Sequence, residues 1–108
     1  MTVVLLAVAG GIGALVRAEV AIHVPRPYGT FLVNVLGAAT LGALVGLGDA
    51  VTPATMTILG VGFAGGLTTF STWMVESAAE PPTRRTVAIA VPLTVGVFVA
   101  AAARALAG

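Results

Sequence analysis

The sequence predicts an all-α membrane protein with four transmembrane helices, and three observations lead to this fold class. Of the 108 residues, 58% are hydrophobic and 8% are charged, whereas soluble domains carry about 25% charged residues. Prolines and charged residues gather in three short stretches, at 23–27, 48–53 and 80–85. These stretches divide the chain into segments close to the roughly 20 residues that cross a bilayer. We find no internal repeat and no second domain, so residues 1–108 are expected to form a single transmembrane domain.

The first helix is expected over residues 2–22, and its apolar stretch has no basic segment before it. It is therefore interpreted as a retained span rather than a signal peptide. Gly10, Gly13 and Arg17 recur at spacings of three and four, so they share one face, where small residues permit close helix contact. Arg17 has two open interpretations: an anchor that reaches the membrane interface, or a charge in a water-filled vestibule that attracts an anion.

The second helix is expected over residues 29–47. Thr30 and Asn34 lie one turn apart and form a polar stripe on an otherwise apolar helix. An asparagine at membrane depth is costly unless it is hydrogen-bonded, so Asn34 either joins helices or lines an ion path. Gly42 and Gly46 have the GxxxG spacing that is typical of helix packing in membranes.

The third helix is expected over residues 53–79, with Thr52 as its N-cap and a break at 65–69 near the middle of the membrane. The break is predicted from the sequence GFAGGLTTFSTW at 62–73, since each glycine costs about 1 kcal/mol relative to alanine inside a helix. Irregular backbone at membrane depth is tolerated only where it is buried in protein or lines a cavity. This stretch is therefore the predicted functional site.

The fourth helix is expected over residues 86–106, with a kink at Pro92 and with Thr94 satisfying the carbonyl that Pro92 frees. With four spans, the first and third loops share a side of the membrane. Most of the arginines lie on that side: Arg26, Arg84 and Arg85, with Arg17 close by. The positive-inside rule would place these loops in the cytoplasm and both termini outside.

The composition excludes several kinds of function. Cysteine is absent, and the net charge of +1 is too small to indicate nucleic acid as a partner. No HExxH, P-loop or GxGxxG pattern occurs, so an enzyme is not expected. What remains is a set of groups that can face an anion: the Asn34 amide, the hydroxyls of Thr30, Thr69, Ser71 and Thr72, and the positive ring edges of Phe70 and Trp73.

Two further points stay open from the residues alone. The Phe70 and Trp73 pair has a spacing that core packing would also produce. The backbone carbonyls exposed at the break have the opposite polarity to the anion-facing groups, so they are suited to a buried cation, especially if a second subunit supplies a matching set.

The chain resembles the Fluc/CrcB family of small bacterial fluoride channels. The resemblance covers the whole chain through three motifs: GGxGAxxR at 10–17, GTFLVNVLG at 29–37 and GFAGGLTTFSTW at 62–73. It implies a multi-pass protein of the bacterial cell membrane that exports fluoride passively and confers fluoride resistance. It also implies an antiparallel, dual-topology dimer with two pores, and a structural sodium ion at the dimer centre held by the carbonyls of Gly65 and Thr68 from each subunit.

The resemblance assigns roles on the positions that match. The family's pore asparagine falls on Asn34, its first pore phenylalanine on Phe70 and its following acid on Glu76. Thr30, Ser71 and Thr72 complete the expected pore, and Arg17 its vestibule. One departure is Trp73, which stands where the family has a second phenylalanine. Its ring edge and indole N–H can still face fluoride, while its bulk narrows or closes that pore.

Two alternatives accompany this interpretation. The bias of arginines toward one side disfavours insertion in both orientations, so the chain is alternatively one subunit of a heterodimeric fluoride channel, with a degenerate pore. A small multidrug exporter has a similar length, but it needs an ionisable group at mid-membrane, and Glu19 lies near the end of the first helix.

Overall fold

A computed structural model describes all of residues 1–108, and the chain is helical apart from short connections. Four helical segments are long and apolar enough to cross a membrane: Thr2–His23, Tyr28–Ala50, Pro53–Ala79 and Pro82–Ala107. The structure contains no β-strand. The prediction of an all-helical protein with four possible membrane spans is therefore confirmed.

The first two spans are regular helices joined by a short loop. Helix α1 covers Thr2–His23 and helix α2 covers Tyr28–Leu47, with residues 24–27 between them. A short 3₁₀ helix, η1 (Gly48–Ala50), follows α2. Gly48 has a φ of 57°, a left-handed conformation that favours glycine, and this residue ends α2.

The third span consists of several helical pieces. It begins with α3 (Pro53–Thr55), continues as a π-helix, η2 (Met56–Ala64), and then as α4 (Gly65–Leu67). The backbone of residues 68–69 is extended, and α5 (Phe70–Ala79) follows. At the start of the span, the Thr52 hydroxyl oxygen accepts a hydrogen bond from the Thr55 N–H at 3.1 Å, as an N-cap does.

The interruption is shorter than the sequence predicted. Gly65, Gly66 and Leu67 are helical, and only Thr68 and Thr69 have extended backbone. Gly66 serves packing instead, because a Cβ placed on it would lie 3.0 Å from the carbonyl carbon of Gly10 in α1. Close contact with a neighbouring helix therefore offsets the low helix propensity of Gly66.

The last helix, α6, runs from Pro82 to Ala107 and starts earlier than the expected residue 86. Pro82 occupies the first turn, where the missing N–H costs no helical hydrogen bond and the fixed φ already suits a helix. The sequence predicts a loop over 80–85, whereas Pro81 is the N-cap of α6 and Pro82 its first residue.

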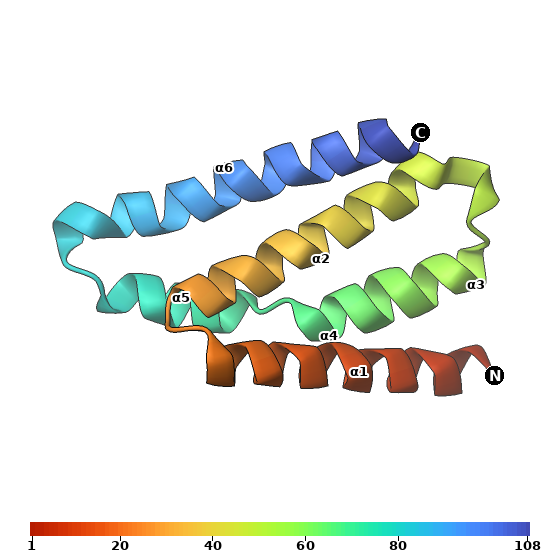
Figure 1. Cartoon of the computed structure of the whole chain (residues 1–108), viewed down its shortest axis with the longest axis horizontal. Helices are drawn as coiled ribbons and strands as arrows, with labels where there is room; N and C mark the ends of the chain where they lie inside the picture. The colour runs from red at the N-terminus through yellow and green to blue at the C-terminus, as the bar shows by residue number, and fades with distance from the viewer.

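The helices lie in an extended layer (Figure 1). Helix α2 packs against α6 on one side and η2 on the other, while α1 packs against η2 and α4. Both termini and η1 lie at one end of the molecule, and the loops after α1 and after α5 lie at the other end (Figure 1). The first and third loops therefore share a side, as four spans require.

Glycines set the distance between α2 and α6. A Cβ on Gly42 would lie 2.9 Å from the Ala100 carbonyl carbon, and a Cβ on Gly46 equally close to that of Arg104. No real Cβ contact is this short, so α2 and α6 approach almost backbone to backbone. The GxxxG spacing thus has the packing role that the sequence predicted.

Little of the chain is buried within one copy. Only 12 of 108 residues are buried, none of them in α6, and large apolar side chains are exposed along all four spans. A soluble monomer rarely exposes so much contiguous apolar surface. The exterior is therefore suited to lipid or to another protein, which agrees with a multi-pass membrane protein.

Candidate functional site

The interruption at residues 68–69 is held by the side-chain amide of Asn34 in α2. The Thr69 N–H donates to Asn34 Oδ1 at 2.8 Å, and Asn34 Nδ2 donates to the Thr69 carbonyl at 3.1 Å. The Asn34 side chain thus satisfies both the N–H and the carbonyl of Thr69, which lies between two helices. Asn34 therefore joins two helices, and its second Nδ2–H has no partner in the chain.

Arg17 points toward the same interruption from α1. Its Nε donates a hydrogen bond of 3.1 Å to the carbonyl of Gly66 in the last turn of α4. Carbonyls at a helix end lack helical donors, and a positive charge there interacts favourably with the helix dipole. Arg17 also lines a cavity of about 100 Å³ together with Arg26, Thr30, Thr69 and Thr72.

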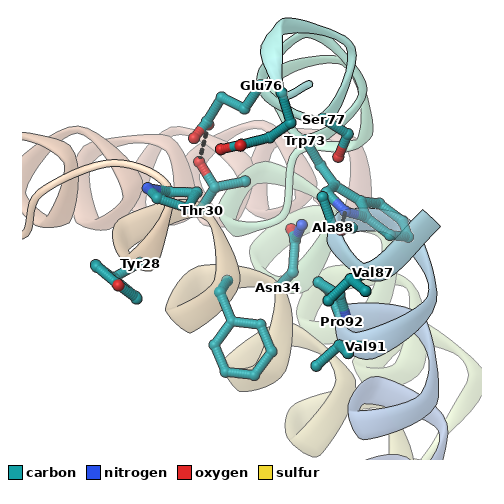
Figure 2. Close-up of a pocket in the computed structure, with 13 residues that line it drawn as sticks. Tyr28, Thr30, Asn34, Trp73, Glu76, Ser77, Val87, Ala88, Val91 and Pro92 are labelled. Carbon is teal, nitrogen blue, oxygen red and sulfur yellow. Dashed lines mark hydrogen bonds between the residues drawn. The ribbon is translucent and has the colours of Figure 1, made fainter. Parts of the chain in front are cut away.

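Glu76 connects α5 to α2 through a hydrogen bond. The Thr30 hydroxyl donates to Glu76 Oε1, as the dashed line in Figure 2 shows. Because its hydrogen is committed to this bond, the Thr30 hydroxyl does not offer it to an anion. The other carboxyl oxygen, Glu76 Oε2, is buried and has no hydrogen-bond partner.

Two larger cavities lie along α2 and share three lining residues. The first, of about 350 Å³, lies between α2, α5 and the start of α6 and includes Thr30, Glu76 and Ala88 (Figure 2). The second, of about 400 Å³, includes Thr68, Phe70 and Gly96. Asn34, Trp73 and Pro92 line both cavities. The two cavities therefore meet at these side chains.

The structure brings together most of the predicted site residues. Thr30, Asn34, Trp73 and Glu76 line the first cavity, Thr68 and Phe70 the second, and Arg17 and Thr72 the small third one. Ser71 and Gly65 are exposed and line none of these three cavities. The pore role predicted for Ser71 and the sodium role predicted for Gly65 therefore stay predictions.

One expectation about Thr94 in α6 and one about the indole N–H of Trp73 in α5 are wrong. Thr94 is exposed and makes no side-chain hydrogen bond, so it does not satisfy the carbonyl that Pro92 frees. That carbonyl, of Ala88, accepts a 3.0 Å hydrogen bond from the indole Nε1–H of Trp73. The same bond removes the indole N–H as a donor for fluoride. Sequence reasoning missed Ala88, although its position four residues before Pro92 marks it as the freed carbonyl.

These features define a multi-pass membrane protein whose polar groups gather at a short interruption in its third span. The chain belongs to the CrcB family: the model of that family, described as "CrcB-like protein, Camphor Resistance (CrcB)", matches residues 4–108.

Similar proteins carry a shared description. The chain is 41% identical to "Fluoride-specific ion channel FluC 2" of Mycobacterium tuberculosis over 103 residues, which are 90% of this chain and 80% of that protein. It is 44% identical to the protein of the same name from Rhodococcus jostii, over 79% of this chain and 76% of the relative. A third, from Synechococcus sp., is 50% identical over 68% of this chain but only 52% of its own length. These names describe ion channels, and the expectation that the chain is not an enzyme is confirmed at the level of the family.

Proposed function

We propose that the chain is a subunit of a fluoride-selective channel that lets cytoplasmic fluoride leave a bacterial cell passively. The observation that carries the proposal is the junction of the two cavities at Asn34, whose amide keeps one N–H unpaired inside an apolar protein. The names of the relatives support fluoride as the ion.

The groups at the junction suit passage rather than tight binding. Beside Asn34, the rings of Phe70 and Trp73 meet edge to face, with centroids 5.8 Å apart and planes at 88°. Ring edges carry partial positive charge and replace part of an anion's hydration without holding it strongly. Conduction requires sites of this kind, which an ion enters and leaves easily. An inside-negative potential drives an anion outward by about 2.3 kcal/mol per 100 mV, so no coupled reaction is needed.

A second subunit completes the pathway in this proposal. Phe70 is 70% exposed in the single chain, and Gly65 and Ser71 are exposed as well. A partner in antiparallel orientation would cover these residues and create two equivalent pores. The partner is either a second copy or a related chain, and the names FluC 1 and FluC 2 among the relatives fit paired subunits.

The interruption also frees a carbonyl for a cation. In a continuous helix the Thr69 N–H would donate to the Gly65 carbonyl, but here it donates to Asn34. The adjacent carbonyl of Ala64 is taken by Thr68. The Gly65 and Thr68 carbonyls therefore fit the expected sodium ligands, and a partner would add an equivalent pair. Bound there, sodium would join the two subunits by coordinating carbonyl oxygens from both.

Removing sodium is expected to weaken the assembly. A ligand at 100 times its dissociation constant stabilises the bound state by about 2.7 kcal/mol, so the loss is measurable as a lower unfolding temperature. The test compares thermal unfolding of the purified protein in sodium chloride and in N-methylglucamine chloride at equal ionic strength. Equal unfolding temperatures in the two salts would contradict the sodium site.

The channel itself is tested by fluoride efflux from liposomes, with chloride as the comparison anion. The expected result is rapid fluoride release with negligible chloride release, slowed at least tenfold by Phe70→Ile. Phe98→Ile is the matched control, because Phe98 is equally exposed, at 71%, and lines none of the three cavities. Phe70→Ile at wild-type rate would exclude this ring from the path. No release from folded wild-type protein would indicate an obligate heterodimer, tested by adding the related subunit.

A further inference from the structure

Helix α6 contains a backbone carbonyl that its own helix leaves unpaired. Pro92 lies inside α6 and has no N–H, so the Ala88 carbonyl, four residues before it, lacks its helical donor. Inside a membrane protein, such a group must find another partner, because hydrocarbon offers none. Ala88 also lines the first cavity, so an unpaired oxygen here would be exposed to the proposed fluoride path.

Trp73 supplies the missing donor from a different helix. Its indole Nε1–H donates to the Ala88 carbonyl at 3.0 Å, and this is the only side-chain hydrogen bond between α5 and α6. Figure 2 shows the indole next to Ala88, with Pro92 in the following turn. The bond therefore fixes both the position of α5 against α6 and the orientation of the indole ring.

The fixed ring stands where the two cavities meet. Trp73 lines both of them, whereas Phe70 lines only the second, and the two rings are perpendicular at 5.8 Å. A displaced indole would change the width of the junction and remove the surface against which Phe70 rests. A bare Ala88 carbonyl would in addition place a partial negative charge beside a passing anion, and like charges repel.

We propose that Trp73 is a positioning residue that covers the carbonyl freed by Pro92 and thereby keeps the path open to anions. This inference rests on the proposed fluoride channel. It reverses a simple steric expectation: Trp73→Phe reduces the size of the ring, yet it slows fluoride because it uncovers the Ala88 oxygen. Pro92→Ala repairs that loss, since an alanine at position 92 supplies the helical N–H that the Ala88 carbonyl lacks.

The experiment is a double-mutant cycle with two measurements, fluoride efflux from liposomes and thermal unfolding. Trp73→Phe is expected to lower the efflux rate about tenfold and to lower the unfolding temperature. In Trp73→Phe/Pro92→Ala, both quantities are expected to return most of the way to wild type, with efflux within about threefold of it. Thr94→Ala is the control in α6, because Thr94 is exposed and has no side-chain hydrogen bond.

The outcomes distinguish a positioning role of Trp73 from steric blockage by its ring. Trp73→Phe with efflux equal to or faster than wild type would overturn the proposal in favour of steric blockage. A double variant no better than Trp73→Phe in either measurement would overturn it as well, because the repair would have failed. If the wild type releases no fluoride either alone or with the related subunit, the proposed channel fails, while the unfolding temperatures of the cycle still decide whether Trp73 covers the Ala88 carbonyl. The chain has a single tryptophan. In Pro92→Ala, where the new backbone N–H pairs with the Ala88 carbonyl, its fluorescence emission therefore reports the release of the indole.

Discussion

Replacing Asn34 by serine is expected to lower fluoride efflux by up to about 100-fold. The Asn34 amide accepts from the Thr69 N–H at 2.8 Å and donates to the Thr69 carbonyl at 3.1 Å. A serine side chain is too short to span both groups, and inside a helix its hydroxyl bonds the carbonyl one turn earlier. The interruption then keeps two unpaired backbone groups, and the anion loses the free amide N–H.

The magnitude follows from the size of these losses. A buried polar group left without its partner costs about 1 to 3 kcal/mol, and about 1.4 kcal/mol corresponds to a factor of ten in rate. The two unpaired backbone groups lower the stability of the fold, whereas the rate falls because the anion loses the amide N–H. A hydrogen bond to a charged group is worth about 1.5 to 3 kcal/mol, which corresponds to a factor of up to about 100 in rate. A lower unfolding temperature should accompany the slower efflux, because the same two bonds hold α2 to the third span.

The measurement is fluoride efflux from liposomes that contain equal amounts of monodisperse protein. Thr40→Ala is the matched control, since Thr40 is also a polar residue of α2, but its hydroxyl bonds only the Leu36 carbonyl of its own helix. Thr40→Ala should stay within about twofold of wild type, because a local bond of this kind adds little stability. Efflux within threefold of wild type for Asn34→Ser would remove Asn34 from the pathway.

The sequence was sufficient for those parts of the fold that depend on local pattern. Hydropathy and the spacing of prolines predict four spans, because a bilayer requires about 20 apolar residues for each helix. The Thr52 cap and the contact of Gly42 with α6 also follow from short-range rules. The Pro81–Pro82 pair suggests a loop because a helix cannot continue through two prolines, although Pro82 is well suited to begin one.

Features that depend on tertiary partners were not predictable in the same way. Gly65 and Gly66 suggest a break by propensity, but close contact of Gly66 with α1 keeps them helical. The partner of the Ala88 carbonyl comes from 15 residues away in another helix, and that of the Thr30 hydroxyl from 46 residues away. A sequence shows which groups need partners, whereas only the packing of helices shows which side chain reaches them.

Replacing Gly42 by leucine is expected to prevent formation of a stable protein. A Cβ at this position already lies 2.9 Å from the Ala100 carbonyl carbon, and leucine adds three more carbons in the same direction. Because the obstacle is the α6 backbone, no side chain can rotate to make room, and the two helices must separate. Extra atoms in a packed interior cost about 1 to 3 kcal/mol or more, a large share of the roughly 5 to 15 kcal/mol that stabilises a domain.

The consequence for function follows from what the two helices carry. Helix α2 holds Thr30 and Asn34, and α6 holds Ala88 and Pro92, so separation would widen both cavities and draw the Ala88 carbonyl away from Trp73. The test measures the yield of monodisperse protein and its unfolding temperature, with Gly11→Leu as the control. Gly11 has nothing within 4 Å of an added Cβ, so the same substitution there should be tolerated. If both variants unfold at the same temperature, α2 and α6 do not pack through Gly42. Another contact would then have to hold Asn34 of α2 and Pro92 of α6 beside the two cavities.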